Sequence, residues 1–482
     1  MNKIIKNIAL FICVSVVFSS CETIDYGNIN DNPNGPTAAV TSQLLTEAQR
    51  SVPSILVNET TINYMQHITE GQYPSPSKYN TLTYNYNDWY TGPIQNLNEI
   101  IKLNTDPDSA VDAAAFGSNN NQIATSKLLR AYFLQFMTDR WGALPWSEAF
   151  QGINFPQPKF DSQESLYGYM FAEVDEALGL INTSAAGPKG DVMFNGDMND
   201  WKSFGNTLKM TMALRVSDAD PATAKSKFEQ AASSGTLVTT NADNLLFNYG
   251  ADNNSASPWY LNFETREDYI ASETMIESLR TNLDPRLFKF FEPARDSESA
   301  ITLFPGGIDK GYVGADDGKV NGNVPDYSFM SSNIIYEKQT PSPIYAAAQV
   351  RFSLAEAAGN GWSVSGSASE HYEAGIAASM DYWGVDPADT AAYIAAHPYS
   401  GIADIAYEKW VALYLNGPEA WAEWRRLDAP TLIPSAYATD QRIPVRHAYD
   451  SSVEDNNKAN YDAVVASQGA DNLHTKLWWD KN

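Results

Sequence analysis

The sequence predicts a mostly α-helical protein in which helices pack as pairs, with long loops and few short strands. The clearest signal lies at residues 341–385, where an alanine-rich apolar run over 344–358 ends at Gly359. A Gly/Ser loop follows, and a second apolar run covers residues 368–383. Two such runs joined by a flexible loop predict a helical hairpin. Strand signals are confined to short stretches such as residues 236–240.

The second helix of this hairpin carries a pattern of small and aromatic residues. Ala368, Tyr372 and Gly375 have the small, aromatic, small spacing of the second helix in a tetratricopeptide-type repeat. Because small side chains let two helices approach closely, we expect the two helices of the hairpin to be in close contact at these positions.

The chain after the hairpin shows clear helix start and end signals. Residues 403–415 place aromatic and aliphatic side chains on one helical stripe, which Gly417 ends. Pro418 begins a further helix whose last turn holds Arg425 and Arg426, in agreement with the preferences at helix termini. Further helices are expected over residues 41–50, 93–103, 122–139, 162–181, 200–216 and 271–280.

The N-terminus reads as a secretory signal. Lys3 and Lys6 precede an apolar run that is too short to span a membrane, and Ser19 and Ser20 follow it directly before Cys21. A cysteine at this position resembles a bacterial lipobox, in which the thiol is lipid-modified before cleavage. Acylation of the thiol and of the new amine would supply enough chains for stable anchoring. The alternative is ordinary cleavage that leaves a free terminal thiol.

The order of these segments predicts three parts. Residues 1–20 form the lipoprotein signal peptide, and residues 21–40 hold the lipidated Cys21 and a flexible tether, whose linker-like segment is GNINDNPNGPT. Residues 41–482 contain no Pro/Ser/Gly-rich linker that would divide them, so we expect one ligand-binding domain there.

The charge balance excludes several classes of ligand. The chain has 32 Lys plus Arg against 58 Asp plus Glu, a formal net charge of -26. Such a protein repels polyanions, which argues against nucleic acid and against direct docking on anionic lipid headgroups. Heavily sulfated or uronate-rich polymers are poor ligands for the same reason.

Common catalytic and metal-binding motifs are missing from the sequence. It contains no HExxH, CxxC, GxSxG or P-loop, and its five histidines never fall at ligand spacing. A calcium-loop-like stretch at residues 28–35 lacks the first carboxylate, and Thr41 stands where the bidentate ligand would be needed. We therefore expect no cofactor and no enzyme. Because a glycosidase needs only two carboxylates, a surface glycoside hydrolase is an alternative.

Several strings of the chain together resemble one protein family. They are LAEAA (354–358), YEAGIAASMDYWGV (372–385), YEKWVALYLNGPEAWAEWRRL (407–427), RIPVR (442–446) and KLWWD (476–480), preceded by DRWGALPWSEAF (139–150), DWKSFGNTLKMTMALRVSDAD (200–220) and DPRLFKFFEP (284–293). In this order they resemble the SusD/RagB-like nutrient-binding outer-membrane lipoproteins of Bacteroidota. The resemblance covers essentially the whole mature chain.

The resemblance implies a fold, a location and a partner. The fold would be SusD-like, with tetratricopeptide-like helical pairs, and the lipid-anchored protein would sit on the outer face of the outer membrane. Its partner would be a SusC-like TonB-dependent transporter, over which such proteins close as a lid during carbohydrate uptake. No catalysis is implied. The ligand would be a neutral oligo- or polysaccharide, or alternatively a peptide, as for a RagB-like lipoprotein.

Aromatic side chains in loops are the candidates for ligand binding, because their faces suit the C–H faces of sugar rings. Most tryptophans lie on helical stripes or within the family-like strings and are assigned to packing. Trp89 and Trp259 instead lie in polar, turn-rich stretches at residues 73–93 and 249–268. For both tryptophans the alternative is packing, for Trp89 as a hydrophobic staple on the helix that begins near Pro93.

The expected binding site is therefore a set of loop residues that hold a neutral glycan. A Gly-rich stretch at residues 304–323 is a further candidate rim. Arg266 would hydrogen-bond to ring hydroxyls. The predicted ligand-binding residues are Trp89, Trp259, Tyr84, Tyr260, Tyr312 and Arg266.

Overall fold

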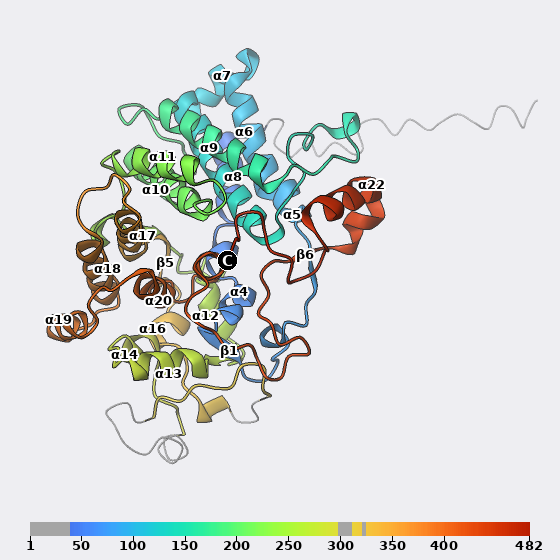
Figure 1. Cartoon of the computed structure of the whole chain (residues 1–482). Helices are drawn as coiled ribbons and strands as arrows, with labels where there is room; N and C mark the ends of the chain where they lie inside the picture. Colours follow the sequence, from blue (N-terminus) through green and yellow to red (C-terminus); the bar gives the residue numbers. More distant parts are fainter. Residues whose placement is uncertain (1–38, 297–310, 321–323) are drawn as a thin grey trace, which may run out of the picture. The chain divides into compact units, whose positions relative to one another are not determined.

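The computed structural model describes residues 39–296, 311–320 and 324–482 (Figure 1). By their mutual contacts, residues 41–482 form one unit. The predicted signal peptide, Cys21 and most of the tether lie outside the described residues. Within the described ranges, no helix is long and apolar enough to cross a bilayer.

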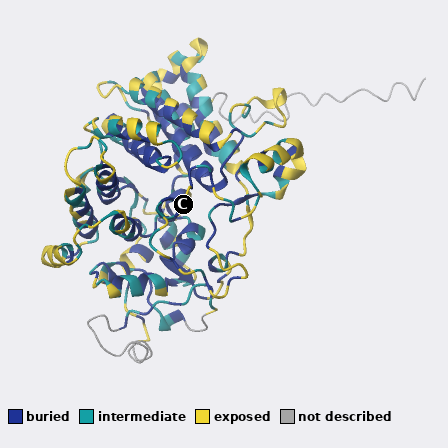
Figure 2. Cartoon of the chain, in the orientation of Figure 1, coloured by how far each residue is buried: buried dark blue, intermediate teal, exposed yellow. Residues whose placement is uncertain are grey.

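Helices build most of the described chain, and each helix predicted from the sequence is present. The longer ones are α2 (Thr41–Gln49), α6 (Gln95–Thr105), α8 (Asn119–Trp141), α9 (Gln163–Leu180), α10 (Met198–Arg215), α11 (Pro221–Ala232), α13 (Glu273–Thr281), α17 (Ala347–Gly359), α18 (Ala368–Tyr382), α19 (Pro387–Ala396), α20 (Ile402–Ala412), α21 (Gly417–Leu427) and α22 (Ser451–Gln468). The sequence reading missed α11, α19 and α22. Figure 2 shows α8 and α10 mostly buried and α19 and α22 largely exposed, so two of the missed helices lack a long apolar stripe.

Shorter helical segments connect these elements. They are α3 (Pro53–Leu56), α4 (Glu59–Tyr64), α5 (Asn87–Trp89), α7 (Pro107–Ala113), α12 (Pro258–Phe263), α14 (Leu287–Phe290) and α16 (Ser332–Ile335), with single turns η1 (Pro76–Lys78), η2 (Tyr90–Ile94), η3 (Ala114–Phe116), η4 (Gly152–Asn154), η5 (Asn241–Asp243) and η6 (Val324–Asp326). The η2 turn is a π-helix that joins α5 to α6.

The strands of the described residues form two-stranded sheets only. They are β1 (Ile68–Glu70), β2 (Thr83–Tyr84), β3 (Leu245–Phe247), β4 (Tyr269–Ala271), β5 (Ser342–Tyr345) and β6 (Ala448–Tyr449). Strand β1 pairs with β4 and β3 with β5, both antiparallel, whereas β2 and β6 are parallel. Each pair joins segments that are far apart in the sequence.

The strand predicted at residues 236–240 is wrong. Its last residue, Thr240, instead caps the η5 turn, because the Thr240 backbone N–H and hydroxyl both donate to the Asp243 carboxylate. A side chain that bonds to nearby backbone competes with strand pairing, and the β-branched composition alone does not reveal this. The first strand of this region, β3, begins at Leu245.

The predicted helical hairpin is confirmed as α17 and α18. A capping box at Ser367 and Glu370 begins α18. A Cβ atom added at Gly375 would lie 2.6 Å from the ring of Phe352, which is fully buried on α17. The glycine therefore lets the two helices approach at the position expected from the sequence.

Replacing Gly375 with Ala should lower the free energy of unfolding. Overpacking against Phe352 costs about 1–3 kcal/mol, which outweighs the roughly 0.5–1 kcal/mol that alanine contributes within a helix. The matched control is Gly168→Ala in α9, where an added Cβ atom has no neighbour within 4 Å and should raise stability. Urea titrations of both variants check this, and a Gly375→Ala protein as stable as Gly168→Ala would contradict it.

A buried network of ion pairs connects the helical layers. Arg215 of α10 is fully buried and lies 3.2 Å from Asp139, 2.6 Å from Glu419 and 2.8 Å from Glu423. Arg426 of α21 continues the network, since it donates to Glu423 and to Glu356 of α17. Lys409 of α20 also pairs with Glu423, at 2.5 Å. These contacts tie α8, α10, α17, α20 and α21 together.

The variant Arg215→Met should destabilise the protein by about 3–5 kcal/mol, because it leaves buried carboxylates without their counter-charge. The control is Arg50→Met, which removes an exposed pair with Glu47, so no measurable change is expected. Thermal and urea unfolding provide the measurement. Equal stability of the two variants would show that the network contributes nothing.

Candidate ligand-binding site

An open groove of about 610 Å³ lies between α5 with η2, the loop at residues 145–158, and α22. Figure 1 places α5 and α22 side by side at one edge of the helical layers. Aromatic rings, prolines and amides line the groove. The aromatic and amide residues among them are Tyr86, Tyr90, Phe150, Phe155, Asn87, Gln95, Asn456 and Asn457.

The aromatic wall of the groove is partly open to solvent. The rings of Tyr90 and Phe150 stack with centroids 5.5 Å apart and an interplanar angle of 25°. Phe150 is 41% exposed and Phe155 is 39% exposed, so both present apolar surface to an incoming ligand. Phe150 also adopts φ of 63°, a left-handed conformation that is unusual for a bulky residue and that is often found at functional sites.

Hydrogen bonds hold the groove in shape. The Tyr90 hydroxyl donates to the carbonyl of Pro145 at 2.5 Å. The amide of Asn457 donates to the carbonyl of Pro158 at 2.7 Å, and α22 is kinked at this asparagine. The Asp161 carboxylate accepts from the backbone N–H groups of Trp146 and Ser147 and so fixes the start of the loop. The walls are thus formed before a ligand arrives.

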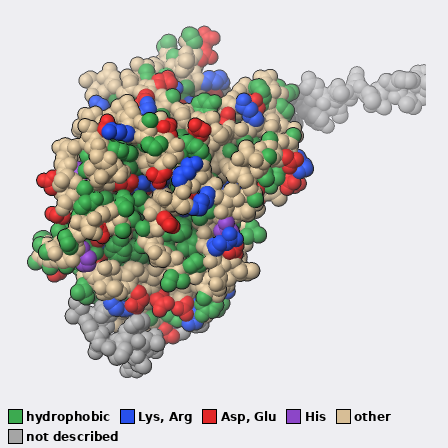
Figure 3. Space-filling model, viewed as in Figure 1, with side chains coloured by type: hydrophobic (Ala, Val, Ile, Leu, Met, Phe, Trp, Pro, Cys, Tyr) green, Lys and Arg blue, Asp and Glu red, His purple; other side chains and the backbone are tan. Residues whose placement is uncertain are grey.

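The chemistry of the groove suits an uncharged ligand. None of the described residues that line it is charged, although the chain as a whole is strongly acidic. Figure 3 shows acidic and basic side chains dispersed over the visible face. The side-chain amides of Asn87 and Gln95 have no hydrogen-bonding partner among the described residues and can bond to ligand hydroxyls. Burial raises the pKa of the Tyr86 and Tyr90 hydroxyls, which therefore stay neutral.

Comparison with models of known protein families assigns the chain to one of them. The family described as "Starch-binding associating with outer membrane", SusD-like, matches residues 33–450. The chain belongs to the SusD-like family. The resemblance inferred from the sequence is thereby confirmed, together with the mostly α-helical fold class. No curated protein matches the chain.

Solved structures share the SusD-like fold over nearly the whole chain. A chitin-binding protein is 26% identical, with a TM-score of 0.77, and the match covers 92% of this chain and 100% of that one. A SusD homolog from Bacteroides fragilis is 20% identical, with a TM-score of 0.77 and the same coverage. A chitin-binding SusD homolog from Flavobacterium johnsoniae is 23% identical, with a TM-score of 0.70, covering 92% and 96% of the two chains.

The SusD-like structure places Trp89 and Tyr84 beside the groove, against α8 and the core. Trp89 ends α5, and its ring lies 5.6 Å from that of Phe133 and 4.9 Å from that of Phe136. Tyr84 stacks on His447 at 3.7 Å. Burial raises the pKa of the Tyr84 hydroxyl, which lies 3.0 Å from that of Tyr64. The loop position expected for Trp89 is wrong, because a helix begins at Asn87.

The structure places Trp259 and its neighbours in a different part of the SusD-like fold. Trp259 lies in α12 instead of the expected loop, and it is only 3% exposed. Tyr260 faces the Lys338 ammonium at 5.1 Å, and Tyr312 lies edge-on to Phe288 at 5.3 Å. Arg266 pairs with Asp268 at 2.6 Å.

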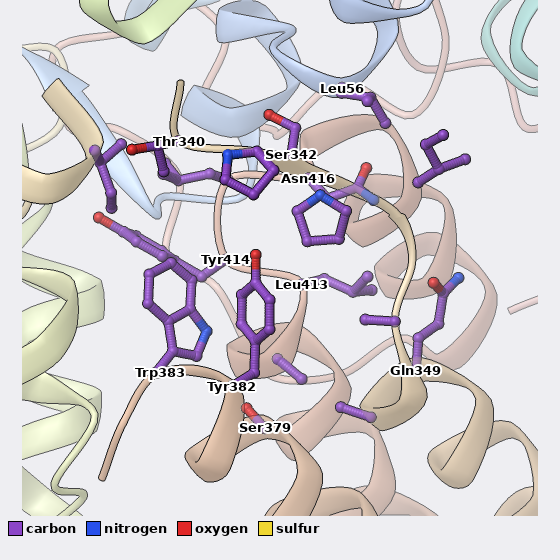
Figure 4. Close-up of a pocket in the computed structure, with 18 of the residues that line it drawn as sticks. Leu56, Thr340, Ser342, Gln349, Ser379, Tyr382, Trp383, Leu413, Tyr414 and Asn416 are labelled. Carbon is purple, nitrogen blue, oxygen red and sulfur yellow. The ribbon is translucent and has the colours of Figure 1, made fainter. Parts of the chain in front are cut away.

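The six predicted residues therefore do not gather around one cavity. Trp89 and Tyr84 pack against the hydrophobic cluster of α6, α8 and α10, whereas Trp259 and Tyr312 belong to the cluster of α4, α13 and α21. Ligand contact by any of the six stays a prediction. Trp259 lines a partly open cavity of about 100 Å³ (Figure 4), which is smaller than the roughly 300–1,000 Å³ typical of ligand pockets.

The sequence reading missed most of the groove. Tyr86 and Tyr90 lie in the aromatic stretch at residues 73–93. In that stretch, however, the sequence predicts only Trp89 and Tyr84 as ligand-binding residues. Phe150 ends the family-like string at residues 139–150, and the sequence did not indicate it as a binding residue. The asparagines of α22 carried no signal, because polar residues in an unassigned helix resemble any solvated surface.

No metal centre is evident in the part of the chain that the structure describes. Groups of three or more His, Cys, Asp or Glu side chains that could hold an ion do not occur there.

Proposed function

We propose that this chain is a surface lipoprotein that binds a neutral oligosaccharide in the groove between α5 and α22 and delivers it to a SusC-like TonB-dependent transporter. The observation that carries the proposal is the uncharged lining of the groove, which combines exposed rings with side-chain amides. Rings that offer apolar faces beside hydrogen-bonding groups are suited to sugars, whose own surface alternates between C–H faces and hydroxyls.

The relatives support a glycan as the ligand class. The family is described as starch-binding, and two of the similar structures are named chitin-binding. Both polymers are uncharged, in agreement with the lining of the groove and with the net charge of -26. Chitin and starch oligosaccharides are therefore the first ligands to test, with peptides as the alternative within the family.

Truncating a solvent-facing ring of the groove should weaken glycan binding without unfolding the protein. We expect wild-type dissociation constants on the order of micromolar to millimolar, because sugars lose hydration and torsional freedom on binding. Phe150→Ala and Phe155→Ala should each cost about 1 kcal/mol, or roughly fivefold in Kd. Calorimetric titration with chitin and starch oligosaccharides, sulfated glycans and mixed peptides provides the measurement.

The matched control for these variants is Phe288→Ala. Phe288 is 38% exposed, nearly the same as Phe150 and Phe155, but it lies outside the groove. Normal binding by both groove variants would contradict the proposed site. Binding of peptides with no binding of neutral glycans would favour the peptide alternative. Trp89→Ala and Trp259→Ala in the same series test the residues named from the sequence, with thermal melts to separate lost contacts from lost packing.

Lipidation of Cys21 is part of the proposal. The variant Cys21→Ser should release the protein into the soluble fraction and abolish incorporation of a labelled fatty acid, because both acyl chains depend on this residue. Fractionation and labelling of cells check the expectation, and protease digestion of intact cells tests exposure at the cell surface. Unchanged membrane partition and labelling of the variant would refute it.

A stable complex with the transporter should be recoverable from native membranes. A tethered protein that closes over a transporter raises the local ligand concentration at its entrance. Affinity purification of the tagged protein in mild detergent should therefore recover a TonB-dependent barrel protein. Failure to do so, under conditions that preserve known pairs of this kind, would count against the transporter partnership.

A further inference from the structure

The partly open cavity beside Trp259 is built like a small ligand site. It lies between α12, strand β5, the end of α18, and the turn from α20 to α21 (Figure 4). These elements differ from those of the groove, and Figure 1 shows α18 and α20 on the opposite side of the molecule from α22. On the face shown in Figure 3, hydrophobic side chains gather where α16 and α20 lie. None of the described residues that line the cavity is charged.

The aromatic walls of the cavity are held by rings behind them. Tyr414 stacks on Phe290 with centroids 4.1 Å apart and an angle of 6°. Trp383 lies edge-on to the same Phe290 at 4.9 Å. Trp259 lies edge-on to Tyr269 at 5.6 Å. The flat surfaces of the cavity are therefore fixed in position.

Polar groups on the cavity wall have no partner within the described ranges of the protein. They are the indole N–H groups of Trp259 and Trp383, the hydroxyl of Tyr382 and the side-chain amide of Asn416. Trp259 is only 3% exposed as a residue, yet its indole N–H keeps some accessible surface and can donate to a ligand. In Figure 4 the Tyr382 ring stands in the cavity with its hydroxyl directed toward the side of Ser342 and Asn416. These groups can donate hydrogen bonds to an acceptor atom of a ligand.

Size, shape and polarity together restrict the ligand. The volume of about 100 Å³ is too small for an oligosaccharide but is of the same order as the roughly 150 Å³ cavity that accepts benzene in a protein core. Flat aromatic walls favour a flat ring. Mostly donor groups favour an acceptor oxygen, and the absence of charge in the described lining favours a neutral molecule.

We propose that this cavity is a second ligand site, separate from the groove, for a neutral single-ring aromatic molecule that carries an acceptor oxygen. Trp259 and Trp383 form its walls, and Tyr382 and Asn416 provide its hydrogen bonds. The site is formed by α12, α18 and α20, so its test does not depend on whether a glycan binds in the groove.

The experiment titrates the full mature chain with benzamide and phenol as probes. Toluene, which lacks the acceptor, and cyclohexanol, which lacks the flat ring, are the matched controls. Ligand-observed saturation-transfer NMR and quenching of tryptophan fluorescence give the dissociation constants. For molecules of this size we expect benzamide to bind with a Kd on the order of 0.1–10 mM, and more tightly than either control.

Two variants locate the bound probe. Tyr382→Phe keeps the ring and removes the hydroxyl. It should therefore raise the Kd of benzamide by roughly threefold to tenfold and leave the Kd of toluene unchanged. Ala378→Leu fills the cavity and should abolish binding of every probe. Tyr169→Phe, on an exposed residue outside the cavity, should have no effect. Thermal melts confirm that each variant is folded.

Three results would overturn the proposal. The first is the lack of saturable binding of benzamide and phenol at about 10 mM, the upper end of the affinity expected for molecules of this size. The second is equal binding of benzamide and cyclohexanol, which would remove the preference for a flat ring. The third is an unchanged Kd in both Tyr382→Phe and a folded Ala378→Leu protein, which would place the probe elsewhere.

Discussion

The arrangement of the long helices depends on the charge network around Arg215. A fully buried guanidinium is stable only where carboxylates compensate its lost hydration, and here Asp139, Glu419 and Glu423 do so from two other helices. Coulombic attraction from these carboxylates raises the pKa of Arg215 despite its burial. Asp139 also accepts from the indole N–H of Trp479 at 2.9 Å, which joins the C-terminal segment to the same centre.

This network explains why the family-like strings of the sequence are structural. Asp139 begins the string DRWGALPWSEAF, Glu419 and Glu423 lie in the string that ends WRRL, and Trp479 lies in KLWWD. Strings that look unrelated in the sequence meet around one buried charge. Their aromatic residues surround the charged groups, as where the Arg425 guanidinium lies 3.8 Å from the ring of Trp421. Ligand-binding residues are therefore to be sought outside these strings or at their ends.

The groove lies at the edge of this framework, where packing no longer fixes the position of every side chain. Tyr86 is buried and the Tyr90 hydroxyl donates to the carbonyl of Pro145. Phe150 and Phe155, in contrast, extend from a loop into solvent. The loop is nevertheless fixed, because Asp161 holds its start and the asparagines of α22 hold its end. A rigid framework with a few exposed rings limits the entropy lost on binding, which matters for a ligand as flexible as an oligosaccharide.

Much of this protein could be predicted from local patterns in the sequence. Helix periodicity, the Pro and Arg residues at the ends of α21, and the small residue at Gly375 depend on residues within a few turns of one another. The resemblance of several strings to one family extended these local predictions to the whole fold. The same patterns could not show that Trp259 is buried in α12, because its turn-rich surroundings resemble a surface loop, and Pro258 is equally compatible with the first turn of a helix.

By itself, then, the sequence determined the helical fold class, the hairpin, the acidic character and the family. Only the tertiary structure decided which aromatic rings face solvent and which rings lie together. Tyr84 stacks on His447 and Trp89 packs on α8, while Phe150 stacks on Tyr90 in a groove that α22 also lines. The physical reason is that a side chain's burial is set by residues distant in the sequence, whereas helix formation is set mainly by its neighbours.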